Sequence, residues 1–126
     1  MITIATLVVA LAAALHVAIF FMESISWTRP GVWKRFGVRN QADAETTKPL
    51  AYNQGFYNLF LAIGAIVGII FFGAGWREAG LALVVFTMAS MFLASIVLIS
   101  TGKGYLRAAV IQGTLPLIGL VLILLS

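Results

Sequence analysis

Four long apolar runs dominate the 126-residue sequence. They extend from Ile2 to about Ser26, from about Leu50 to Gly73, from Ala79 to Ser100 and from Leu106 to Leu125. A bilayer core about 30 Å thick is crossed by a helix of about 20 apolar residues, and each run reaches that length. Because 62% of the residues are hydrophobic and only 10% are charged, the chain has too little polar surface to cover a soluble fold. The sequence therefore predicts an integral membrane protein.

The runs also predict the fold class. Strands of a membrane barrel alternate polar and apolar residues, and these runs do not. The first run has no basic residue before Arg29 and is longer than the apolar part of a signal peptide, so we expect a retained helix. Asn40 and Asp43 resemble a capping pair, which places the start of the second helix near Gln41. We predict an all-α, polytopic four-helix bundle forming a single transmembrane domain over residues 1–126, with helices at about 2–26, 42–73, 79–100 and 105–125.

The basic residues predict the orientation of this bundle. Seven of the eight lie in the first and third loops: Arg29, Lys34, Arg35, Arg39, Lys48, Lys103 and Arg107. The second loop contains only Arg77, next to Glu78. Positive loops stay in the cytoplasm, so we expect loops 28–48 and 101–107 to be cytoplasmic and both termini to lie on the other side of an inner membrane. Membrane topology and contact with the lipid bilayer explain these basic residues more simply than an entrance for an anionic substrate does. We expect no nucleic-acid partner.

Small residues recur at helical spacing in the first two runs. Ala10, Ala14 and Ala18 form a stripe, and Gly64 with Gly68 forms a GxxxG pattern. Small faces allow helix backbones to approach closely in lipid. Contact within the bundle is the simpler interpretation, and the seam of a homo-oligomer is the alternative.

Polar side chains within the runs lie at a common depth. With a rise of 1.5 Å per residue, Glu23 lies roughly 6 Å below Trp27. Asn53 and Gln54 lie at a similar distance beyond Lys48, and Gln112 lies at a similar distance beyond Arg107. His16 and Glu23, seven residues apart, share one helix face. We predict a polar pocket in the cytoplasmic half of the bilayer. Its candidate residues are His16, Glu23, Asn53, Gln54, Tyr57, Asn58 and Gln112.

This set of polar residues is larger than helix packing needs, which favours a binding site. We expect the pocket to bind or transport a small lipophilic or amine-bearing molecule, with Glu23, the only acid within a span, at its centre. One alternative is a membrane enzyme that uses Glu23 and His16 as acid and base on a lipophilic substrate. Another is a structural or accessory subunit whose polar network serves packing alone. A single histidine and no cysteine predict no metal site, and we expect no cofactor.

The pattern of these residues resembles a known family. The matching positions are His16, Glu23, Trp27, Phe36-Gly37, the segment Asn53-Gln54-Gly55-Phe56-Tyr57-Asn58, and Gln112-Gly113 ahead of Pro116. They resemble the small bacterial membrane-protein family catalogued as domain of unknown function 1304. The resemblance implies a four-helix integral membrane protein and supplies no activity.

Two other groups are similar only at the level of fold. The chain looks like small multidrug resistance transporters in helix count and in the carboxylate on its first helix. It also looks like the membrane-associated eicosanoid and glutathione metabolism group. Tyr57 stands where that group has an acid, and the arginines expected before it are missing. Glutathione carboxylates require such arginines, so glutathione chemistry is not expected.

Overall fold

The computed structural model describes residues 2–126, which form four long helices and short connections. The long helices are α1 (Ile2–Phe20), α3 (Gln41–Gly73), α4 (Arg77–Ser100) and α5 (Leu106–Leu125). A π-helical turn, η1 (Phe21–Ile25), extends α1. The described part of the chain contains no strand, and four helical segments are long and apolar enough to cross a membrane. The predicted all-α, four-helix fold is therefore confirmed.

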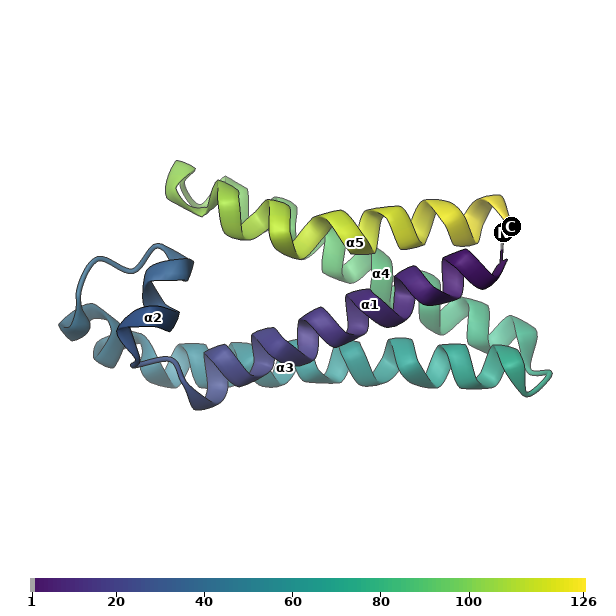
Figure 1. The fold of residues 1–126 in the computed structure, drawn as a ribbon, viewed down its shortest axis with the longest axis horizontal. Coiled ribbons are helices and arrows are strands. Elements are labelled where there is room, and N and C mark those ends of the chain that lie inside the picture. The colour runs from purple at the N-terminus through teal and green to yellow at the C-terminus, as the bar shows by residue number, and fades with distance from the viewer. Residues whose placement is uncertain (1) are drawn as a thin grey trace.

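The long helices form a ring. α1 packs against α3 and α5, α4 packs against the same two helices, and α1 lies diagonally opposite α4. Figure 1 shows both termini at the end of the bundle that also holds the α3–α4 turn. The opposite end holds the α4–α5 turn and the long connection between α1 and α3. That connection includes the short helix α2 (Pro30–Trp33) and the 3-10 turn η2 (Lys34–Phe36).

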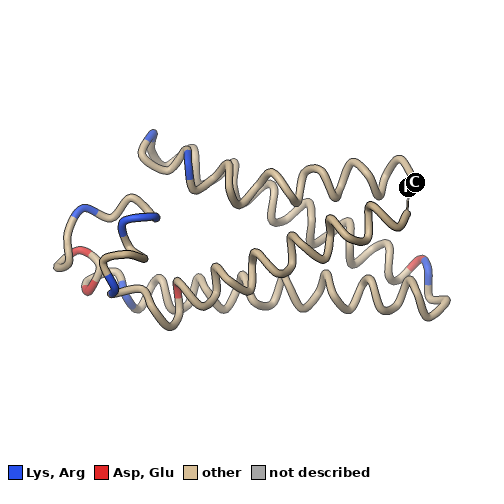
Figure 2. Tube along the Cα trace, viewed as in Figure 1, with Lys and Arg blue, Asp and Glu red and all other residues tan. Residues whose placement is uncertain are grey.

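The charges divide between these two ends. Figure 2 shows that the lysines and arginines gather at the end formed by the α1–α3 and α4–α5 connections, while Arg77 lies with Glu78 at the other end. The helical ring thus places the two basic loops side by side, as the count of spans requires.

The core of the bundle is made largely of small side chains. Its buried residues are Val9, Ala12, Ala13, Ala62, Ala65, Val84, Met88 and Met91. A Cβ atom added at Gly68 would lie 2.8 Å from a Val84 methyl and 3.0 Å from the Gly80 carbonyl oxygen of α4. A Cβ at Gly64 would lie 2.9 Å from the Thr87 methyl. The GxxxG pattern is therefore a close contact between α3 and α4, and the expectation of packing within the bundle is confirmed for it.

The alanine stripe of α1 has a different place. Ala10, Ala14 and Ala18 are exposed on the outer side of the helix, and the buried face consists of Ala5, Val9, Ala12, Ala13, His16 and Ile19. The expected bundle contact is wrong for this stripe. Since α1 is apolar on every side, its hydrophobic pattern does not indicate which face turns inward.

The connection between α1 and α3 packs on the first turns of α3. Trp27 and Trp33 are buried together with Ala44 and Ala51. The Trp33 indole Nε1 donates to the Gln41 side-chain oxygen at 2.9 Å. The basic loop is thus a small folded unit with its own core, although its sequence alternates aromatic and basic residues.

The start of α3 agrees with the predicted cap. The Asn40 side-chain oxygen accepts a hydrogen bond from the Asp43 backbone N–H at 2.8 Å, as an N-cap residue does. α3 consequently begins at Gln41 and runs for 33 residues, which is longer than a bilayer crossing requires. Its first turns support the loop.

Candidate functional site

A cavity of about 490 Å³ lies between the helices, toward the end with the basic loops. Four long helical segments contribute to its walls. Five of the seven predicted site residues line it together: His16, Glu23, Gln54, Asn58 and Gln112. The α4 side is mostly apolar and consists of Met91, Ala94, Val97 and Leu98, with Thr101 beyond them. The cavity therefore joins a polar wall to a hydrocarbon wall.

The other two predicted residues, Asn53 and Tyr57, lie on the exposed surface of α3 and outside this cavity. Gln54 and Asn58 are separated by one helical turn and both line the cavity, although Gln54 is also exposed. Asn53 and Tyr57 each precede them by one residue, which rotates their side chains by about 100° around the helix axis. The two pairs have the same spacing, so spacing alone does not show which pair faces the interior.

Glu23 lies in the middle of the π-helical turn η1. Such turns are rare and are frequently found at functional sites. The turn places the backbone N–H of Ser26 3.0 Å from the Phe21 carbonyl oxygen, a bond over five residues. The next residue, Ser24, donates its hydroxyl hydrogen to the Tyr52 carbonyl oxygen at 2.7 Å. The π turn is thereby attached to α3, and no feature of the sequence predicted it.

Glu23 is 7% exposed, and its carboxyl group is held by α3. The Asn58 side-chain Nδ2 donates to its Oε1 at 2.5 Å. Asn58 Nδ2 also donates to the carbonyl oxygen of Gln54 at 3.3 Å, which orients the amide. This hydrogen bond fixes one carboxyl oxygen and leaves the second one for another partner.

His16 lies deeper in the same cavity and is 2% exposed. Its Nδ1 lies 2.9 Å from the Ala12 carbonyl oxygen. Since a carbonyl oxygen only accepts, Nδ1 carries the hydrogen, and Nε2 of the neutral ring is an acceptor. Among residues 2–126, every fully buried side-chain nitrogen or oxygen has a hydrogen-bond partner. Nε2 has none, so it is not fully buried, and His16 lines the cavity. The cavity thus offers a carboxyl oxygen and an imidazole nitrogen as acceptors.

The comparison with known families agrees with the sequence pattern. Residues 10–124 match the family described as "Protein of unknown function (DUF1304)". The chain belongs to this family. The resemblance seen in the sequence is therefore confirmed over nearly the whole chain. No curated protein and no solved structure matches the sequence.

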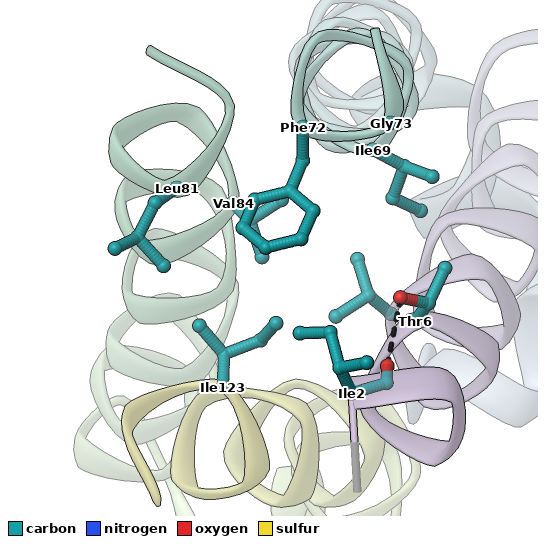
Figure 3. Close-up of a pocket in the computed structure, with 9 residues that line it drawn as sticks. Ile2, Thr6, Ile69, Phe72, Gly73, Leu81, Val84 and Ile123 are labelled. Atoms are coloured by element: carbon teal, nitrogen blue, oxygen red, sulfur yellow. Dashed lines mark hydrogen bonds between the residues drawn. The ribbon is translucent and has the colours of Figure 1, made fainter. Parts of the chain in front are cut away.

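The DUF1304 protein also has an apolar cavity, of about 150 Å³, at the end with the termini. Figure 3 shows Ile2, Ile69, Phe72 and Ile123 around it, from three helices. Its one hydroxyl group is satisfied, because Thr6 Oγ1 donates to the Ile2 carbonyl oxygen at 2.9 Å. The polar groups of the interior are therefore concentrated in the half of the bundle near the basic loops.

Proposed function

We propose that this DUF1304 protein binds a small lipophilic amine in the polar cavity and carries it within the membrane. The observation that supports this most directly is the joint presence of Glu23 and His16, both buried, opposite the apolar wall of α4. An ammonium group would donate to the free Glu23 oxygen and to His16 Nε2. A hydrocarbon chain would contact Met91 and Leu98. The volume of about 490 Å³ is within the range of about 300–1,000 Å³ of small-molecule sites.

Decylamine and decanol are suitable probes, because they share one chain and differ in the head group. The protein in nanodiscs would be assayed for radiolabelled decylamine by scintillation proximity, with decanol as competitor. We expect saturable decylamine binding that decanol displaces poorly. Glu23→Gln keeps the shape of the side chain and removes its ability to ionise, so it should abolish the preference for the amine. Glu78→Gln, an exposed acid at the opposite end, is the matched control and should bind as the wild type does.

Equal decylamine binding by the wild type and by Glu23→Gln would contradict the proposal. If the same substitution then lowered thermal stability, the polar residues would serve packing alone. Circular dichroism, recorded before binding is measured, would show whether Glu23→Gln is still helical and so distinguish a lost site from a misfolded protein.

We further propose that the cavity opens toward the cytoplasm. The support is the gathering of seven basic residues at that end of the bundle, since positively charged loops remain on the cytoplasmic side. The chain has no cysteine, and Ala42 and Ala74 are exposed at opposite ends, so Ala42→Cys and Ala74→Cys form a matched pair. In intact cells, an impermeant maleimide should label position 74 and should label position 42 only after permeabilisation. The reverse labelling would place the cavity on the other side.

A further inference from the structure

A second cavity, of about 320 Å³, lies on the side of the bundle between the first span and α5. Its walls are apolar and include Leu15, Ala18 and Met22 on one side and Ala108 and Ile111 on the other. Ala18 and Ile111 are exposed, so this α1–α5 groove opens to the outside of the bundle. In a membrane, that outside surface faces lipid. The small side chain of Ala18 leaves room there.

One end of the α1–α5 groove is cationic. Arg35, in the turn η2, lines it and is exposed. The turn is held in place, since the backbone N–H of Val38 donates to the Trp33 carbonyl oxygen at 3.2 Å and Gly37 adopts a φ of 75° that favours glycine. A guanidinium is always charged and matches phosphate oxygens in pairs. The buried acid of the first span, Glu23, forms its hydrogen bond with Asn58 rather than with Arg35.

We infer that the α1–α5 groove binds one acyl chain of an anionic phospholipid, with the lipid phosphate on Arg35. The groove provides the two surfaces that such a lipid needs, hydrocarbon along the helices and a cation on an ordered turn of the loop. The cluster of basic residues at the same end (Figure 2) attracts anionic lipid to this leaflet. This inference concerns a different surface from the amine site and does not depend on it.

The bound lipid would contact the wall of the polar cavity. Phe36 and Gln112 line both the α1–α5 groove and that cavity. A chain in the groove would therefore pack against two residues that also line the cavity of Glu23. Lipid in the groove would close the polar cavity laterally.

Native mass spectrometry tests the inference on the full chain. The protein would be released from nanodiscs containing equal parts of phosphatidylcholine and phosphatidylglycerol. We expect one retained phosphatidylglycerol per chain. Arg35→Gln should reduce its preference over phosphatidylcholine by about tenfold, because the guanidinium attracts the net negative charge of phosphatidylglycerol, whereas the choline group of phosphatidylcholine neutralises the charge of its phosphate. Arg39→Gln, an exposed cation of the same loop outside the groove, should retain the preference. Ala18→Phe should fill the groove and remove the lipid of either class.

The other outcomes are distinct. Equal losses in Arg35→Gln and Arg39→Gln would show diffuse attraction and overturn the site. Retention of phosphatidylglycerol by Ala18→Phe, with a wild-type melting temperature, would place the lipid elsewhere. A dimer that Ala18→Phe disrupts would show that a second copy covers the groove. Displacement of the lipid by added oleate at equal concentration would assign the site to free fatty acid. Each of the last three results would also reject a phospholipid bound in this groove.

Discussion

Gly55 of α3 packs closely against the first span and lies three residues before Asn58 of the candidate site. A Cβ atom there would overlap the Ser24 hydroxyl oxygen and would lie 3.0 Å from the Ser24 backbone nitrogen and 3.1 Å from the Phe20 carbonyl oxygen. The hydroxyl could rotate away, but the two backbone atoms could move only if the helices separated. We therefore expect Gly55→Ala to destabilise the protein, although alanine is the better helix former.

The magnitude follows from three effects. Overpacking a close contact costs about 1–3 kcal/mol. Displacement of the Ser24 hydroxyl breaks its 2.7 Å hydrogen bond to Tyr52, which costs about 1 kcal/mol. Alanine instead of glycine in a helix offsets about 1 kcal/mol of this. The free energy of unfolding should therefore fall by about 1–3 kcal/mol. Gly73→Ala is the matched control on the same helix, because a Cβ there meets nothing within 4 Å.

The assay is equilibrium unfolding in mixed micelles with increasing sodium dodecyl sulfate, followed by circular dichroism. Ser24→Ala removes the oxygen that the new methyl group would overlap. The double variant should therefore lose less stability than the two single variants together. The reasoning would be refuted if Gly55→Ala unfolded at the same detergent fraction as Gly73→Ala. Strict additivity of the two single variants would show that the hydroxyl contributes nothing to the clash.

Two further predictions use the same assay. Gly68→Leu should lower the unfolding midpoint more than Leu61→Phe, because a Cβ atom at position 68 would lie 3.0 Å or less from backbone and side-chain atoms of α4, whereas Leu61 is only partly buried. Equal midpoints would contradict close packing at Gly68. Asn58→Leu should cost about 0.5–2 kcal/mol, because it removes the hydrogen bond to Glu23, whereas Asn53→Leu on the exposed side should change stability little, and similar losses in both would argue against an inward role for Asn58.

Much of the fold could be predicted because it depends on length and composition. Four apolar runs, separated by short polar connections, leave few arrangements in lipid other than four helices. The start of α3 was also predictable, because an Asn40 cap is a local interaction. The small core around Trp27 and Trp33 was not, because it depends on how the loop folds back on α3.

The candidate site could be predicted only in part. Depth along each helix follows from the rise per residue, and it placed in one half of the bilayer the five residues that line one cavity: His16, Glu23, Gln54, Asn58 and Gln112. Rotation about each helix axis does not follow from depth. In a helix that is apolar all round, the inward face is decided by neighbouring helices, and the alanine stripe of α1 and the outward pair on α3 were misplaced for that reason.

The π-helical turn accounts for how one short segment can serve both packing and the site. Glu23 and Ser24 are consecutive, yet both bond to α3, at Asn58 and at Tyr52. In an α-helix two consecutive side chains diverge by about 100°. Both reach the same neighbouring helix only if they point to either side of its axis. The π turn has a wider circumference, and its register differs from that of the α-helix before it. The Ser24 contact with Gly55 and the Glu23 carboxyl position are thus parts of a single backbone feature. A substitution that forces this contact apart should disturb the carboxyl group as well as stability, whereas Glu23→Gln leaves the contact intact. Comparing Gly55→Ala with Glu23→Gln therefore separates the packing of the segment from the chemistry it presents to the cavity.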